Sequence, residues 1–355
     1  MAVLWNLMSR EVFGESCMFA ETNTARLMFP AENVWRVYCP ALDTEYLEGR
    51  DWIHPSGSDV LIRPKGSNIP MLDETVLYPA DENCRYYPHS DANAVRGGIN
   101  GCNIRFDAGN FFARMQMEID YQASELNFQF RLCPQDERLL RFKALMHTPG
   151  SHCRISWLGD SISEGYNASG YLKKPPFQPP FAELVVDTLR KQQQLLVDFH
   201  NYSLNGATSS YPLKHPAMFL EDKPDLLVIA FGMNDLAEPG GVKLYLNNIA
   251  EIIRLNRKVS PMTEYLLVAP MSGNPQWSFT PPEQTQCFAA ALRQFVRKCP
   301  QDTALVDLTG LWCAFLERKS FFDLTGNGVN HPNDYGHRIL ARGILNMLDQ
   351  EKFPL

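Results

Sequence analysis

The sequence of 355 residues lacks the cysteine patterns of a disulfide framework or a zinc site. Its nine cysteines are scattered, with no Cys-x-x-Cys pair and no Cys/His spacing typical of metal ligands. An odd number of cysteines in a long chain fits reduced thiols better than disulfides. We therefore expect a cytoplasmic location and no bound metal.

Long apolar runs and long basic runs are also missing. No apolar stretch approaches the roughly 18 residues that a membrane-spanning helix needs. The first residues, Met1 to Glu11, have no basic region and meet charge early, which is unlike a signal peptide. The formal net charge of −7 makes nucleic acid and anionic membranes poor partners. The expected partner is a small-molecule substrate, and the sequence leaves the oligomeric state open.

What is present is an ordinary globular composition, with 45% hydrophobic and 21% charged residues. The chain is longer than one hydrophobic core usually serves, so we predict two domains, residues 1–150 and 151–355. Residues 1–32 show no clear period. After them come segments that are β-branched and aromatic or that alternate apolar with polar residues, which is typical of half-buried antiparallel strands. They are Val34–Tyr38, Asp59–Pro64, Phe112–Tyr121, Leu126–Leu132 and Leu140–Leu145. This pattern predicts an antiparallel, jelly-roll-like β-sandwich.

The second part of the chain alternates strands with helices. Such alternation predicts a parallel α/β sheet with helices on both faces. Ligands of such folds bind beyond the carboxyl ends of the strands. The predicted strands are Arg154–Leu158, Leu195–Tyr202, Asp225–Phe231, Glu264–Ala269 and Thr303–Leu308, and a last helix is expected over residues 333–350.

Four short polar motifs fall at the predicted strand and helix ends. A serine hydroxyl needs a base to become a nucleophile, and the oxyanion formed by its attack needs hydrogen-bond donors. Each motif alone has an ordinary explanation, such as a turn glycine or a helix cap. His337 is expected to be structural. The motifs are Gly159-Asp160-Ser161, Asn205-Gly206, Gly232-Met233-Asn234-Asp235 and Asn330-His331-Pro332-Asn333-Asp334.

Taken in this order, the four motifs resemble the motif blocks of the SGNH (GDSL-type) hydrolase superfamily. The resemblance implies a flavodoxin-like three-layer α/β/α domain and a serine esterase that needs no cofactor. It implies that Ser161 is the nucleophile and His331 the general base. The backbone N–H groups of Ser161 and Gly206, with the Asn234 side chain, would form the oxyanion hole.

One position departs from the family pattern. The family usually has an Asp three residues before the catalytic His, and here that position is Gly328. The alternatives are a Ser–His dyad, or an imidazole held by a main-chain carbonyl, by Asn327 or Asn330, or by the more distant Asp323. Losing the orienting group lowers the rate without abolishing catalysis.

A β-sandwich before such a domain resembles two-domain carbohydrate esterases that deacetylate sugars. We therefore expect hydrolysis of small acyl esters, preferably O-acetylated saccharides. The alternatives are an acyltransferase, thioesterase or lipase with the same machinery, or a non-catalytic carbohydrate-binding protein. The polar stretch from Met71 to Gly101 is either a solvated connection or a loop that reaches over the neighbouring active site. The aromatic residues Tyr166, Tyr211, Trp277 and Trp312 either pack on a sugar ring or serve as partly buried packing residues.

Overall fold

The computed structural model describes residues 4–355, and its carboxyl-terminal part is built on a parallel five-stranded sheet. The strand order is β11-β10-β12-β13-β14, and all neighbours run parallel. This is the flavodoxin-like order, which confirms the predicted α/β fold class. The strands are β10 (His152–Gly159), β11 (Leu196–Asn201), β12 (Leu226–Ala230), β13 (Glu264–Val268) and β14 (Thr303–Val306).

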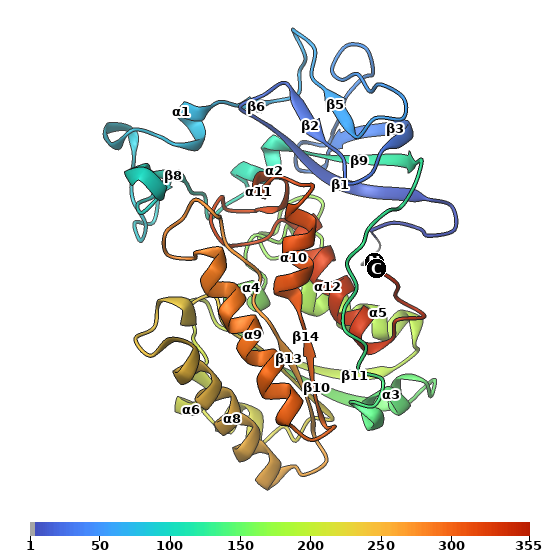
Figure 1. Ribbon diagram of the computed structural model, residues 1–355, viewed down its shortest axis with the longest axis vertical. Coiled ribbons are helices and arrows are strands. Elements are labelled where there is room, and N and C mark those ends of the chain that lie inside the picture. Colours follow the sequence, from blue (N-terminus) through green and yellow to red (C-terminus); the bar gives the residue numbers. More distant parts are fainter. Residues whose placement is uncertain (1–3) are drawn as a thin grey trace.

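Helices cover both faces of this sheet. The helix α5 (Phe181–Gln192) packs beside α12 (Asp334–Leu348), and α8 (Gly241–Val259) packs beside α9 (Pro282–Lys298). Figure 1 shows the sheet between these two pairs. The remaining helical segments of this part are α4 (Ser161–Glu164), α6 (Tyr211–Lys214), α7 (Ala217–Leu220), η4 (Asp235–Ala237), α10 (Leu308–Leu316) and α11 (Phe321–Leu324).

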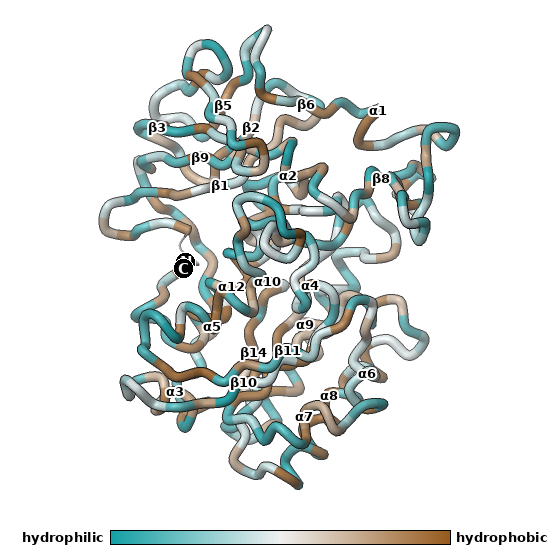
Figure 2. Tube along the Cα trace, turned by 180° about the vertical axis from the view of Figure 1, so that it is seen from behind, coloured by the Kyte–Doolittle hydropathy of each residue, from teal (hydrophilic) through white to brown (hydrophobic). Residues whose placement is uncertain are grey.

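The sheet forms because its central strands are apolar on both faces. Every residue of β12, β13 and β14 is buried. Strands covered on both sides carry continuous apolar runs instead of an alternating pattern. Figure 2 shows these hydrophobic stretches in the interior of the α/β part. None of the helices in residues 4–355 is long and apolar enough to cross a lipid bilayer.

The amino-terminal part is built on a mainly antiparallel sheet of order β4-β3-β9-β1-β6. Only β6 pairs in parallel, with β1. Two two-stranded ladders, β2-β5 and β7-β8, accompany it. The strands are β1 (Glu11–Ala20), β2 (Thr24–Arg26), β3 (Ala31–Cys39), β4 (Thr44–Glu45), β5 (Val60–Ile62), β6 (Met71–Leu72), β7 (Ala94–Val95), β8 (Ile104–Arg105) and β9 (Gln116–Ala123). The helical segments are η1 (Pro40–Leu42), α1 (Glu74–Leu77), η2 (Asp81–Asn83), η3 (Ile99–Gly101) and α2 (Phe111–Met115).

The antiparallel character of this part is confirmed, but two of the predicted strands are wrong and a third begins later than predicted. Residues 126–132 form no strand, and residues 140–145 lie in the helix α3 (Leu140–Met146). The alternating stretch from Phe112 begins as the helix α2 and becomes a strand only at Gln116. The strand β1, in the middle of the sheet, lies in the segment for which no period was found.

The helix α3 and the residues just before it contact the α/β sheet, although they precede residue 150. The Gln135 side chain exchanges two hydrogen bonds with the backbone of Leu305 on the edge strand β14, at 2.6 and 3.0 Å. The backbone N–H of Phe142 donates to the Glu264 carboxylate at 2.7 Å. Residues 135–142 therefore pack against the strands β13 and β14 of the α/β sheet without forming a strand themselves. The domain division at residue 150 stays a prediction.

The polar stretch after Met71 is not simply a solvated connection, because its second half contacts two loops of the α/β part. The N–H of Ile99 donates to the Gln276 carbonyl at 2.7 Å, and the Trp277 indole donates to the Arg96 carbonyl at 3.1 Å. Just beyond the stretch, Asp107 N donates to the Asn327 carbonyl at 3.2 Å, in the loop that carries His331. The alternative of a loop that reaches the catalytic region is therefore the better description.

Candidate active site

Ser161 lies where the strand β10 ends and the short helix α4 begins. Asp160 caps this helix, and its carboxylate accepts the Ile162 N–H at 3.0 Å. As the first residue of the helix, Ser161 has no helical acceptor for its own N–H. Only 3% of its surface is exposed. The turn therefore presents a hydroxyl and an unpaired helical N–H at one position.

The structure brings Ser161 and His331 together. The Ser161 Oγ lies 2.9 Å from His331 Nε2, although 170 residues separate them in the chain. His331 sits in the loop between α11 and α12, just before the cap residue Asn333. This distance is within hydrogen-bond reach for a nucleophile and its base.

The other face of the imidazole is held by Asn167, which the sequence reasoning did not single out. His331 Nδ1 lies 2.9 Å from Asn167 Oδ1. An amide oxygen only accepts, so Nδ1 carries the proton and Nε2 offers its lone pair to the serine. The Asn167 amide nitrogen donates to the carbonyls of Gly109 and Gly326 at 3.1 and 3.2 Å. These two carbonyls fix which end of the amide faces the imidazole.

The residues proposed earlier as orienting groups have other contacts. The Asp323 carboxylate accepts the N–H groups of Met18 and Ser320 at 2.7 and 2.8 Å. The Asn327 Oδ1 accepts three backbone N–H groups of its own loop, including that of His331 at 3.0 Å. Neither side chain bonds to the imidazole. The expectation that one of them orients it is therefore wrong for this structure.

The position where the family usually has Asp is closed to any side chain. Gly328 has a φ of +85°, and a Cβ there would lie 2.3 Å from the Arg105 carbonyl and 2.6 Å from the Phe112 ring. Both neighbours belong to the amino-terminal part. Because that part fills the space of the usual carboxylate, Asn167 takes over the contact with the imidazole.

Gly206 and Asn234 lie in adjacent loops beside the nucleophile turn. Leu204 N donates to the Gly159 carbonyl at 3.1 Å, which ties the Gly206 loop to the end of β10. Gly206 has a φ of +74°, a conformation that favours glycine. The Asn234 amide donates to the Ala207 carbonyl at 2.9 Å. An amide nitrogen has two N–H groups, so one remains to face an oxyanion.

Three carboxylates hold these loops in register. The Glu164 carboxylate accepts the Asn205 N–H at 2.6 Å and the Tyr171 hydroxyl at 3.0 Å. Asp235 accepts both the N–H and the hydroxyl of Ser209, the hydroxyl at 2.5 Å. Asp160 is fully buried, and burial raises its pKa to about 7, opposed by backbone N–H groups that include that of Met233.

Burial also determines the protonation state of the general base, His331. It lowers the pKa of His331 to about 3, with a smaller contribution from the nearby His337. His331 is therefore neutral at neutral pH and able to take a proton. His337 is structural as expected: it is fully buried, with ring nitrogens 3.3 Å from the Phe181 N and the Tyr166 carbonyl.

Of the four aromatic residues considered for sugar binding, Tyr166 is the one whose ring lies beside His331. The Tyr166 ring lies 5.4 Å from the His331 ring and 4.8 Å from that of Tyr171. Trp312 is fully buried and is a packing residue. Tyr211 packs on His215, and Trp277 packs on Phe279. Among residues 4–355, no group of three or more His, Cys, Asp or Glu side chains is arranged to hold a metal ion.

Comparisons with known proteins identify one family and several similar solved structures. The model of the GDSL-like Lipase/Acylhydrolase family matches residues 157–339. No curated protein matches the chain. One similar solved structure is Axe2, an acetylxylan esterase from Geobacillus stearothermophilus, at 19% identity and a TM-score of 0.47; the match covers 56% of this chain and 95% of Axe2. A GDSL-like lipase from Parabacteroides merdae has 19% identity and a TM-score of 0.45, with 57% and 98% of the two chains covered.

A third similar structure is LAE5, an alpha/beta hydrolase from the metagenome of Lake Arreo, with 16% identity and a TM-score of 0.46 over 57% of this chain and 97% of that one. The family match covers just over half of the 355 residues and includes Ser161, Gly206, Asn234 and His331. This chain belongs to the GDSL-like lipase/acylhydrolase family and is a carboxylic ester hydrolase.

Proposed function

We propose that this enzyme hydrolyses small acyl esters, preferably O-acetylated saccharides, through an acyl-enzyme on Ser161. The observation that carries the proposal is the 2.9 Å contact between Ser161 Oγ and His331 Nε2. His331 takes the hydroxyl proton as the oxygen attacks the ester carbonyl. The protonated imidazole then gives that proton to the departing alcohol.

Charge on the carbonyl oxygen would be met by three donors: the N–H groups of Ser161 and Gly206, and the Asn234 amide. A water molecule, deprotonated by His331, then releases the acid from the serine. Asn167 acts through His331, because its carbonyl oxygen selects the tautomer whose Nε2 is unprotonated. It carries no charge, so the imidazolium formed during the reaction is stabilised less than beside a carboxylate.

Two observations support a short acyl group on a saccharide. Ser161 is only 3% exposed, so little of the surrounding space is open to a long chain. Tyr166 lies beside the imidazole and Tyr171 lies beside Tyr166, and Tyr171 is 36% exposed, so its ring can pack on a sugar. The saccharide also rests on the resemblance to two-domain carbohydrate esterases.

The cellular location remains a prediction. All nine cysteines are free, which supports a reducing compartment. Cys17, Cys39 and Cys153 are buried, and burial raises the pKa of each thiol. Such thiols are poor nucleophiles and unreactive toward oxidation.

The test compares wild type with Ser161→Ala on p-nitrophenyl acetate, butyrate and octanoate, and on an acetylated xyloside with acetate release as the readout. We expect the substitution to lower kcat by at least about 10³-fold. Turnover that rises with chain length would contradict the acetyl-saccharide assignment and favour a lipase or thioesterase. Acyl transfer to an added alcohol in preference to water would favour an acyltransferase. No Ser161-dependent turnover on any ester would refute the proposed mechanism.

A further inference from the structure

The loop that carries His331 is closed by its own hydrogen bonds. Gly326 N and Thr325 Oγ1 both donate to the His331 carbonyl, at 2.8 and 3.1 Å. Asn327 Oδ1 accepts three backbone N–H groups, those of Val329, Asn330 and His331. These internal hydrogen bonds fix the conformation of the loop itself, so we expect a change in its attachment to displace the whole loop. Its attachment to the rest of the protein therefore decides where the imidazole lies relative to Ser161.

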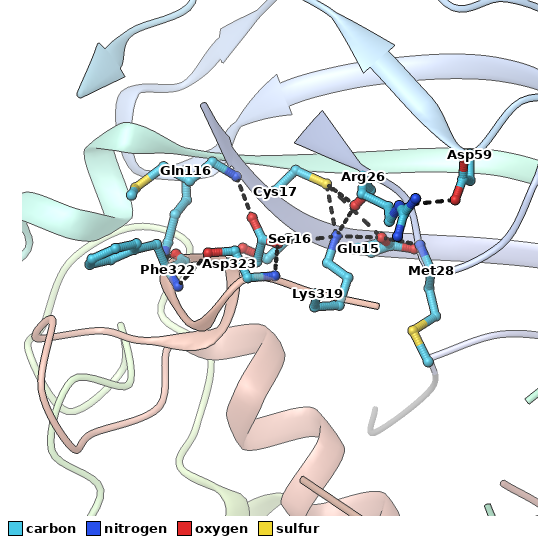
Figure 3. A network of polar contacts seen from close by, with 12 residues as sticks. Glu15, Ser16, Cys17, Arg26, Met28, Asp59, Gln116, Lys319, Phe322 and Asp323 are labelled. Atoms are coloured by element: carbon cyan, nitrogen blue, oxygen red, sulfur yellow. Dashed lines mark hydrogen bonds and ion pairs between the residues drawn. The ribbon is translucent and has the colours of Figure 1, made fainter. Parts of the chain in front are cut away.

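One side chain of the amino-terminal sheet attaches this loop at both of its ends. Gln116, the first residue of β9, donates to the carbonyls of Phe322 and Thr325 at 2.7 and 2.8 Å. Its oxygen accepts the Asn333 side-chain N–H at 2.9 Å. Figure 3 shows Gln116 descending from the sheet toward Phe322 and Asp323. Both N–H groups of the amide are used, and the residue is only 6% exposed.

The strand β1 strengthens the same attachment. Met18 N donates to the Asp323 carboxylate at 2.7 Å, and Asn333 also donates to Ser16 Oγ at 3.1 Å. Further along β1, the Lys319 ammonium contacts the Glu15 carboxylate at 2.7 Å, with both side chains fully buried (Figure 3). The His331 loop is therefore mounted on the amino-terminal sheet through a buried polar seam.

We propose that Gln116 is a positioning residue for His331, so that the amino-terminal sheet forms part of the catalytic centre. This inference rests on the proposed function of Ser161 and His331. Removing the Gln116 amide leaves the buried carbonyls of Phe322 and Thr325 without this donor, while the Asn333 amide keeps Ser16 Oγ and the Asp323 carbonyl as acceptors. The loop then shifts to reach water or other donors. A shift of a fraction of an ångström lengthens the contact between Ser161 and His331, and general base catalysis depends on that distance.

The test uses Gln116→Met, which keeps the length and removes every hydrogen bond, and Gln116→Glu, which keeps the acceptor for Asn333 and removes both donors. Tyr121→Phe is the matched control. Tyr121 lies on the same strand and is fully buried, and its hydroxyl bonds to Glu15 and Phe29 N and not to residues 322–333. It therefore shares the Glu15–Lys319 end of the seam but not the direct attachment of the His331 loop. For both Gln116 variants we expect kcat on p-nitrophenyl acetate to fall about 10- to 100-fold with KM unchanged. For Tyr121→Phe we expect kcat within about 2-fold of wild type, with Tm lowered as in Gln116→Met.

A second readout does not depend on turnover. The His331 imidazole, followed by NMR of ¹³C-labelled histidine, should titrate at a higher pH in Gln116→Met, because a displaced loop lets water reach the ring. Tyr121→Phe should leave this titration unchanged. Wild-type kcat and an unmoved His331 titration in Gln116→Met would overturn the positioning role. Absence of Ser161-dependent hydrolysis in the wild type would instead overturn the proposed function, and the titration would still decide the role of Gln116.

Discussion

The α/β part and the amino-terminal part are stabilised by different kinds of interaction. The strands β12, β13 and β14 of the α/β part are buried on both faces and almost wholly apolar, as in Leu226–Ala230. The strand β1 of the amino-terminal part is buried over residues 14–19 but contains Glu15 and Ser16 there, at 0% and 3% exposure. The first kind of strand is stabilised by transfer of apolar surface from water. The second kind requires a specific partner for each polar group.

This difference separates two roles in the candidate site. The α/β part carries the atoms proposed to react, and their local turns are set by strand ends and helix caps. The amino-terminal part carries contacts that determine where those atoms lie. The Gly109 carbonyl accepts from Asn167, the Asp107 N–H donates to the Asn327 carbonyl, and Gln116 donates to the backbone before the His331 loop. A change in the amino-terminal part should therefore affect stability and alignment together.

The largest loss of stability is expected from Lys319→Met, in the buried polar contacts of the amino-terminal part. Burial by itself would lower the pKa of Lys319, but the negative charges of Asp323 and Glu15 raise it well above its usual value. Removing this cation leaves the buried carboxylates of Glu15 and Asp323 without an opposite charge, at a cost of about 3–5 kcal/mol, or about 10²- to 10⁴-fold in the unfolding equilibrium. Urea denaturation measures the loss.

The control for this prediction is Lys191→Met in the α/β part. Lys191 forms a pair with Asp187 on the surface of α5, at 3.4 Å with its side chain 70% exposed. Such exposed pairs contribute little, so its removal should leave the unfolding midpoint nearly unchanged. Equal losses in the two variants would contradict the idea that the two parts are stabilised differently.

A smaller effect is expected from Asn167→Ala, which removes the contact with His331 Nδ1. Without that contact the imidazole rotates and samples both tautomers, so we expect kcat to fall about 10- to 100-fold with KM little changed. Asn346→Ala is the control, because Asn346 is also buried and also donates to a backbone carbonyl, that of Phe353 at 2.9 Å. A kcat equal to that of the control would mean that His331 acts without an orienting group.

The sequence predicted the α/β part well for a physical reason. Most of its strands and the helices α5, α8, α9 and α12 bury continuous or periodic apolar surfaces, and the spacing of apolar residues in the sequence reveals these surfaces. The Ser161 and His331 motifs lie at the ends of these elements, so their approach follows once the sheet is parallel. The distance of 2.9 Å confirms that approach.

The amino-terminal part was harder to predict because its polar residues are buried through contacts with distant segments. Glu15 breaks the apolar pattern of β1, yet its partner Lys319 lies 304 residues away. Asn167 likewise carries no local signal, since its three partners come from residues 109, 326 and 331. A register shift between Val12 and Glu15 further disturbs the alternation in β1.

The smallest and most specific effect is expected from Asn167→Asp. A carboxylate beside Nδ1 stabilises the imidazolium and so raises the pKa of His331 from about 3. Because the protonated imidazole cannot accept the Ser161 proton, the acid limb of kcat/KM should move to higher pH, by at least about one unit. The carboxylate also cannot donate to the Gly109 and Gly326 carbonyls, which explains why an amide suits this position. Measurement of kcat/KM on p-nitrophenyl acetate between about pH 2 and 8 checks the shift, because this range includes the wild-type acid limb near the pKa of about 3. Asn346→Asp is the control for an added charge. An acid limb at the wild-type pH would mean that residue 167 and the base are electrostatically uncoupled.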